Sequence, residues 1–196
     1  MKKNVGIFIF DDAEVLDFAG PFEVFSVTSE LNSYELFNVF TISSSKEPVK
    51  AVNGLSVNPD YDFTHHPQID ILIISGGGGT RRLIKNREIL NWIFPIIENA
   101  EYTLSICSGA RILGELGLLD NKPYCTHHEV YDHMKEIAPT GIPHPELRYI
   151  QTERIFTSGG ISAGIDLSFH VIEQLLGDDV ANKTAAYMEY RRYELN

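Results

Sequence analysis

The residue best suited to covalent chemistry is Cys107, which stands between a β-prone run at 102–106 and a helical apolar pattern. A strand that turns sharply into a helix at a cysteine exposes the thiol at the carboxyl end of the strand. The spacing Ser105-x-Cys107-x-Gly109, with Ser108 also small, suits such a tight turn. We therefore predict a nucleophile elbow at Cys107, with a thiolate favoured by the first amides of the helix. An unfavourable φ/ψ at Cys107 would be the sign of such a functional turn. The alternative is an inert packing cysteine.

Asp17 is the acid that we predict to serve this thiol. It follows the first apolar run, residues 4–10, and precedes a predicted helix. A carboxylate at that place could relay a proton to or from a thiol. The alternative is a helix N-cap or a surface acid.

Four consecutive glycines, Gly76–Gly79, follow the buried apolar run 69–75. The N–H groups of Gly76 and Gly77, together with that of Ser108, are predicted to stabilise an anion that develops on the substrate. A phosphate cradle and a plain loop are the alternatives. The phosphate cradle is disfavoured because neither G-x-x-x-x-G-K-[ST] nor G-x-G-x-x-G is present.

Histidines and a second cysteine leave further roles open. His127 and His128 follow a short β-prone run, and a pair of Cys107 with His127 would be typical of a thiol hydrolase. No set of histidines has the spacing of metal ligands, so we predict no metal site. Cys125 is interpreted as a packing residue, with a resolving thiol as the alternative.

Strands and helices alternate along the chain, which predicts a doubly wound, mostly parallel α/β sheet with helices on both faces. Strands are predicted at 4–10, 37–43, 69–75, 102–106, 124–126, 149–151 and 154–157, with a hairpin at 49–58 that turns at Asn53-Gly54. Helices are predicted at about 21–31, 85–99, 110–116, 128–137, 162–176 and 179–190, with Pro21 in a first turn and a loop at 139–145. Residues 1–196 are predicted to form one domain, with Asp17, the glycines and Cys107 at the carboxyl edge of its sheet.

The composition excludes several classes of protein. The formal net charge is −11 without a basic tract, so we predict no nucleic-acid partner. Two cysteines in 196 residues argue against a disulfide scaffold. No apolar stretch reaches the ~18 residues of a membrane span, and the N-terminus does not read as a signal peptide. The predicted location is the cytoplasm.

Five segments together resemble the ThiJ/PfpI superfamily, within the class I glutamine amidotransferase-like folds. They are residues 16–25, 74–77, 106–110, 126–127 and 157–167. The chain looks most like the isocyanide hydratase branch and the similar domain of AraC-type regulators. This resemblance implies a flavodoxin-like domain, a homodimer, Cys107 as the nucleophile and Asp17 as its acidic partner.

Two positions help to indicate which branch of the superfamily this chain resembles. Protease-like members of the superfamily carry a histidine directly after the cysteine, where this chain has Ser108. Many relatives carry an aromatic residue after Thr-His, where this chain has His128. The resemblance therefore favours the hydratases. It does not predict which residues form the wall of the substrate pocket at position 128.

The leading hypothesis is a cofactor-free cysteine enzyme that hydrates a small isocyanide to an N-substituted formamide. The first alternative is an amidase, protease-like or glyoxalase-like thiol enzyme that uses Cys107 with His127. The second is a redox-sensing or ligand-sensing domain without turnover. No helix-turn-helix pattern follows the last predicted helix, which disfavours a regulator but not a redox sensor.

Overall fold

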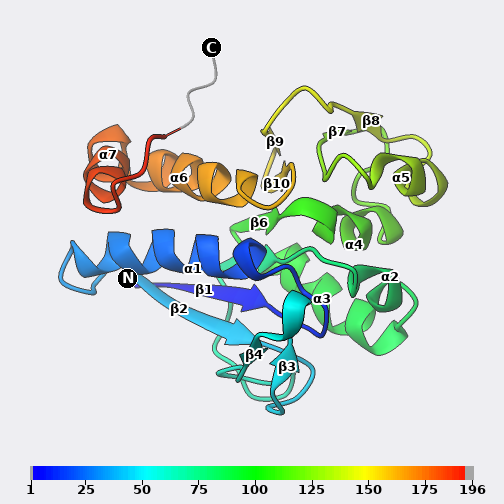
Figure 1. Ribbon diagram of the computed structural model, residues 1–196, viewed down its shortest axis with the longest axis horizontal. Helices are drawn as coiled ribbons and strands as arrows, with labels where there is room; N and C mark the ends of the chain where they lie inside the picture. The colour runs from blue at the N-terminus through cyan, green and yellow to red at the C-terminus, as the bar shows by residue number, and fades with distance from the viewer. Residues whose placement is uncertain (1, 193–196) are drawn as a thin grey trace.

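A six-stranded sheet forms the centre of the computed structural model, which describes residues 2–192 (Figure 1). Its strands lie in the order β2-β1-β5-β6-β10-β9. All neighbours are parallel except the pair β9–β10. The bounds are β1 (Lys3–Phe8), β2 (Phe37–Ile42), β5 (Ile71–Ile74), β6 (Tyr102–Ser105), β9 (Tyr149–Thr152) and β10 (Ile155–Ser158). The prediction of a doubly wound, mostly parallel sheet is thus confirmed, and the chain forms a flavodoxin-like α/β domain.

Helices cover both faces of this sheet, as expected for parallel strands that are buried on both faces. Helices α1 (Val15–Glu30), α6 (Ala163–Leu176) and α7 (Asp178–Tyr187) pack together on one face, with α3 (Arg87–Asn99) on the other (Figure 1). The short helices α2 (Thr80–Leu83), α4 (Ala110–Glu115) and α5 (Tyr131–Ile137) lie beyond the carboxyl ends of the strands. They therefore surround the edge at which a site is expected.

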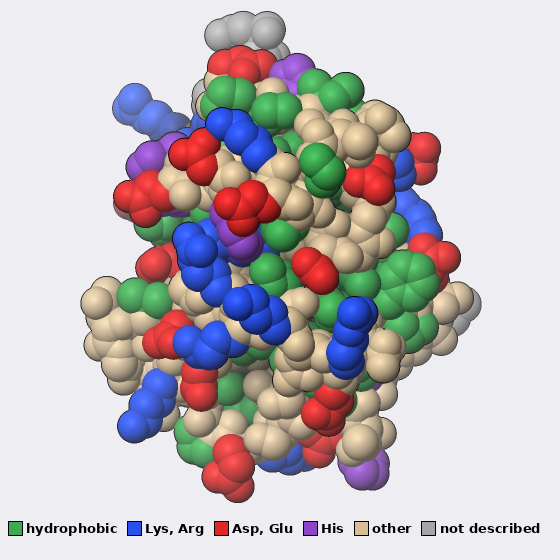
Figure 2. Space-filling view, turned by 90° about the vertical axis from the view of Figure 1, so that its right-hand side faces the viewer, with side chains coloured by type: hydrophobic (Ala, Val, Ile, Leu, Met, Phe, Trp, Pro, Cys, Tyr) green, Lys and Arg blue, Asp and Glu red, His purple; other side chains and the backbone are tan. Residues whose placement is uncertain are grey.

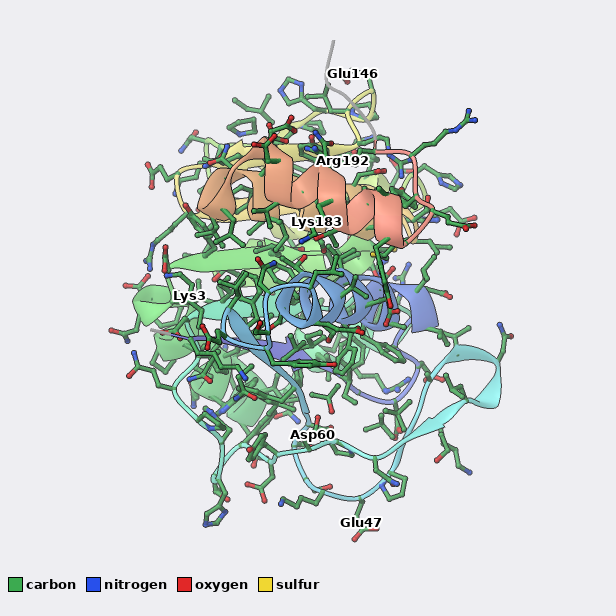
Figure 3. All side chains as sticks on the ribbon, turned by 90° about the vertical axis from the view of Figure 1, so that its left-hand side faces the viewer. Lys3, Glu47, Asp60, Glu146, Lys183 and Arg192 are labelled. Carbon is green, nitrogen blue, oxygen red and sulfur yellow. The ribbon has the colours of Figure 1, made fainter. Side chains whose placement is uncertain are left out.

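Close contacts join the helices of the first face. A Cβ atom on Gly20 would lie 2.8 Å from Cγ1 of Ile165, so this glycine lets α1 approach α6 closely. The buried hydroxyls of Thr28 in α1 and Thr184 in α7 lie 3.1 Å apart. Arg192, labelled in Figure 3, forms ion pairs with Glu173 of α6 and Asp178 of α7.

Two small ribbons lie outside the main sheet. β3 (Val49–Lys50) and β4 (Ser56–Val57) form the predicted hairpin, with Asn53 at φ 63° and Gly54 at φ 89° in its turn. β7 (Pro123–Tyr124) pairs in parallel with β8 (Ile142–Pro143). The strand predicted at 124–126 is thus shorter and outside the central sheet, and the loop predicted at 139–145 contains β8.

Two helix starts differ from the prediction. Helix α1 begins at Val15, so Pro21 lies inside the helix and not in its first turn. The missing N–H of Pro21 removes one helical hydrogen bond, which the packing of this buried helix tolerates. Asp17 consequently lies in the first turn of α1, and not before it. Helix α5 begins at Tyr131 and not at His128.

Within residues 2–192, no helix combines the length and the apolar character needed to cross a membrane.

Candidate active site

Cys107 occupies a sharp corner between β6 and α4. Its φ is 54°, in the left-handed region that a side chain with a Cβ rarely adopts. Its N–H donates to Gly159 O at 3.2 Å, and its carbonyl accepts a hydrogen bond from Thr126 Oγ1 at 2.6 Å. Such strain costs about 1–3 kcal/mol and persists only where the surroundings enforce it. The expected strained elbow is therefore present.

The corner is crowded, which explains its small residues. A Cβ atom on Gly109 would lie 2.7 Å from the carbonyl oxygen of Ile74 and 3.0 Å from that of Ser75. Ser108 is buried, and its hydroxyl donates to Gly77 O at 3.0 Å. These contacts tie the elbow to the end of the neighbouring strand β5.

Asp17 enters the site from the first turn of α1, with no exposed surface. Its Oδ2 accepts the N–H of Gly76 at 2.9 Å. Its Oδ1 is buried and has no well-aligned donor among residues 2–192. The thiol of Cys107 is close enough to interact with this carboxyl, so an oxygen able to take a proton lies beside the sulfur.

The electrostatics of this pair reverse one prediction. Burial raises the pKa of Asp17 from 3.8 to about 7. Burial, followed by the negative charge of Asp17, raises the pKa of the Cys107 thiol from 9.0 to about 12. The predicted thiolate at rest is thus wrong, because amides at the elbow do not offset desolvation beside a carboxylate. At neutral pH the sulfur carries its proton.

Two backbone amides nevertheless point at the sulfur. The N–H groups of Ser108 and Ile161 interact with the thiol of Cys107 and lower its pKa, less than burial raises it. Ile161 has φ 51°, a second strained position that brings its amide into the site. Its part in the site had no signal in the sequence beyond the preceding Gly159-Gly160.

Gly76 and Gly77 have a different task from the one predicted. Their N–H groups donate to Asp17 Oδ2 and Ser108 Oγ, at 2.9 and 2.8 Å, and so are not free to meet a substrate anion. A Cβ atom on Gly76 would lie 2.6 Å from both Asp17 Oδ2 and Ser108 N. We therefore interpret these two glycines as residues that position the acid and the elbow.

Cys107 is 5% exposed, and that surface opens into a cavity of about 240 Å³. Ser108, Gly77, Gly78 and His127 also line it. The thiol is therefore nearly buried yet accessible to a small molecule. A second cavity of about 290 Å³, at the ends of β1 and β2, contains none of the predicted site residues.

His127 lines the cavity without engaging the thiol. Its Nδ1 accepts a hydrogen bond from the N–H of Glu129 at 3.3 Å. Within the described part of the chain, His127 and Cys107 form no hydrogen bond with each other. Burial lowers the pKa of His127, so it is neutral at pH 7. The geometry thus does not support the Cys107–His127 pair, although both residues border the same space.

The second cysteine is fully buried away from this surface. Cys125 Sγ donates to Thr157 O at 3.1 Å, and burial raises the pKa of its thiol to about 12. These contacts fit a packing residue, and both cysteines are free thiols. Among the described residues, no group of histidines, cysteines and acids could hold a metal ion.

Several cavity residues were missed from the sequence, chiefly Arg111, Arg81 and Glu14. Arg111 lies four residues after Cys107 at the start of α4 and is 4% exposed. Its place in the first turn of the helix that follows the elbow could have indicated it. Arg81 and Glu14 are placed by tertiary packing and carry no such signal.

Comparisons with known proteins show the family and the fold. A sequence profile described as the DJ-1/PfpI family matches residues 3–174. An isonitrile hydratase of Pseudomonas putida is 29% identical over 190 residues, which are 97% of this chain and 79% of that protein. The transcriptional regulator GbdR of Pseudomonas aeruginosa is 26% identical over 97% of this chain. This chain spans about half of that regulator, 51% of its length.

Solved structures show the same fold. A ThiJ/PfpI family protein from Pseudomonas syringae superposes with a TM-score of 0.87 at 24% identity, over 100% of this chain and 78% of that one. DJ-1beta of Drosophila melanogaster gives a TM-score of 0.83 at 15% identity, over 97% of this chain and 100% of that one. At these identities the likeness concerns the arrangement of the backbone.

Proposed function

Because the chain belongs to the DJ-1/PfpI family, we propose that it hydrates small isocyanides to N-substituted formamides. The observation that carries this proposal is the pair of Cys107 and Asp17, a strained thiol beside a buried carboxyl with a pKa of about 7. An isocyanide carbon accepts a nucleophile and then a proton, and the pair holds both. The relative named isonitrile hydratase, at 29% identity, supports the same chemistry.

In the first step the Cys107 sulfur attacks the terminal carbon while Asp17 takes the thiol proton. A free thiolate is not needed, because the base lies beside the sulfur. Asp17 then delivers that proton to the same carbon, which leaves an S-linked thioimidate. The isocyanide and the thiol have combined without loss of an atom, and Asp17 is again ionised.

In the second step water adds to the thioimidate carbon. Asp17 accepts a proton from the attacking water and passes it to the imine nitrogen, which gives a tetrahedral carbon that bears OH, NHR and the sulfur. As the C–S bond breaks, Asp17 accepts the hydroxyl proton and passes it to the departing sulfur, so the products are the N-substituted formamide and the free thiol. The amides of Ser108 and Ile161 stabilise the departing sulfur as negative charge develops on it.

A second candidate is a ligand-sensing domain that binds without turnover. It is supported by the match to a transcriptional regulator over 97% of this chain. A peroxide sensor is less well supported, because reactive cysteines have lowered pKa values and the pKa of Cys107 is raised to about 12. The two candidates differ in whether the bound molecule changes.

The test is the appearance of the formyl proton by NMR when purified protein is mixed with an alkyl isocyanide. We expect steady turnover by the wild type and a loss of about a thousandfold or more in Cys107→Ala. Cys125→Ala, which removes the other free buried thiol, is the matched control and should retain activity. Equal rates in wild type and Cys107→Ala would refute the proposal, whereas binding without turnover in the wild type would favour the sensor.

A further inference from the structure

Arg111 is a buried cation at the wall of the cavity. Its side chain is 4% exposed and lines the same space as Cys107. Nε donates to His133 Nδ1 at 3.1 Å, and Nη1 donates to Thr80 Oγ1 at 2.9 Å. The guanidinium is thus fixed by neutral partners on α5 and α2.

No carboxylate neutralises this guanidinium. Arg111 forms no ion pair with any acid among residues 2–192, and its Nη2 donates to no described residue. A charge held out of water normally has a partner, because desolvation costs several kcal/mol. Burial and the nearby charge of Arg81 both lower the pKa of Arg111, as expected for a cation that lacks a counter-ion.

Other cations strengthen the positive potential at this place. Arg81 lines the cavity, and the charges of Arg111, Arg81 and Lys85 all act on His133. Figure 2 shows this face, over α2, α4 and α5, where several lysine and arginine side chains lie near the middle, next to a histidine and with acidic side chains among them. The whole chain carries a formal charge of −11, so this cluster stands out from the rest of the molecule.

Two acids also border the cavity. The side chain of Glu129 is 77% exposed, so water screens its charge. Glu14 is half-buried and forms no ion pair among the described residues. Neither forms an ion pair with the guanidinium, which is the one deeply buried charge among the described residues that line the cavity.

We propose that the cavity takes a small substrate that carries a carboxylate, and that Arg111 binds this carboxylate through its unused Nη2 group. Resting on the proposed function, this inference names the substrate class as an isocyanide with an anionic tail. A guanidinium suits this role because its planar donors match the two oxygens of a carboxylate. Arg81, at the same cavity, adds attraction for the incoming anion.

The test uses butyrate and butyramide, which have nearly the same shape but differ in charge. Neither carries an isocyanide, so their binding does not depend on turnover. Calorimetric titration of the wild type should show butyrate binding at least about tenfold more tightly, a difference of about 1.4 kcal/mol. In Arg111→Gln the ratio should fall to about one. Arg87→Gln, an exposed arginine on α3 outside the cavity, is the matched control and should keep the wild-type ratio.

Equal affinity for the two compounds in the wild type, or no measurable binding of butyrate, would overturn the inference. An unchanged preference in Arg111→Gln would overturn it as well. Thermal unfolding of each variant checks that it is folded, and Arg111→Lys, which keeps the charge, should retain part of the preference. If butyrate binds selectively but no isocyanide is hydrated, the proposed reaction fails while the anion site stands.

Discussion

At the scale of single residues, the site depends on Cys107 and Asp17 being buried side by side. Both residues and their place at the carboxyl edge of the sheet were predicted from the sequence, but the protonation state predicted for the thiol was wrong. Local sequence shows that amides start a helix at Cys107; it does not show that a carboxyl will be buried against the sulfur. Desolvation and that neighbour together raise the pKa of the thiol to about 12.

Removal of the acid's charge should lower the pKa of the thiol. In Asp17→Asn the Coulombic repulsion of the thiolate by Asp17 disappears, so alkylation of Cys107 by iodoacetamide should begin at lower pH. The measurement is the alkylation rate as a function of pH. It is made in a Cys125→Ala background, so that Cys107 is the only thiol that can be alkylated. An unchanged or raised pKa would show that Asp17 does not act on the sulfur.

Asp17 should also make stability depend on pH. Its pKa is about 7 in the folded protein and 3.8 as an unperturbed group, so the folded state binds more protons between these values. Stability should therefore be greatest below the lower value and fall as pH rises through the window, by up to about 4 kcal/mol. Urea unfolding at pH 4.5 and 7.5 should show a smaller fall in Asp17→Asn than in the wild type.

The matched control is Glu30→Gln, an exposed acid at the end of the same helix. This variant should follow the wild type at both pH values. An equal fall in Asp17→Asn and wild type would contradict the raised pKa.

At the scale of elements, the glycine loop after β5 serves to hold other parts of the site. The sequence predicted the loop and the strand before it, but assigned its amides to the substrate. In the structure those of Gly76 and Gly77 are already used by Asp17 and Ser108. Which acceptor meets an amide depends on elements distant along the chain, and no local pattern contains that information.

The first and third glycines should differ sharply in tolerance. In Gly76→Ala the new Cβ would lie 2.6 Å from Asp17 Oδ2, whereas at Gly78 nothing lies within 4 Å. We expect Gly76→Ala to lose about 1–3 kcal/mol of stability together with most activity. Gly78→Ala should be close to the wild type in stability. Chemical unfolding and the formamide assay measure the two effects, and similar behaviour of the two variants would contradict the positioning role.

Element prediction succeeded where side chains have one clear environment. The run at β5 was found because a strand buried on both faces is apolar at every position, and β1 was found by its apolar second half. The start of α1 was misplaced because Pro21 reads locally as a helix start, while packing against α6 carries the helix past it. The short strand β8 lies in a predicted loop and forms by pairing with β7, a tertiary contact that the local sequence does not display.

At the scale of the whole molecule, a strongly acidic chain has a cavity at the elbow whose buried charge, among the residues described, is the cation Arg111. This separation allows attraction of a small anion into the site without attraction of large polyanions to the surface. The fold class, predicted from alternating strands and helices, is confirmed by the sheet order and by the family match. The homodimer and the cytoplasmic location stay predictions.

The acidic surface should prevent binding to nucleic acid. With a net charge of −11, the chain should give no mobility shift with duplex DNA at low ionic strength, because phosphate contacts need clustered lysines and arginines over a wide surface. Retardation of the DNA that disappears with added salt would contradict this prediction, and would show that the cations on the face in Figure 2 also bind polyanions.

The most direct test of the account is the covalent intermediate on Cys107. After brief mixing with an alkyl isocyanide and acid quench, intact-protein mass spectrometry should show the wild type heavier by the full mass of the isocyanide, with the adduct mapped to Cys107. Cys107→Ala should show no adduct and produce no formamide. Formamide production by Cys107→Ala at the wild-type rate would contradict the account.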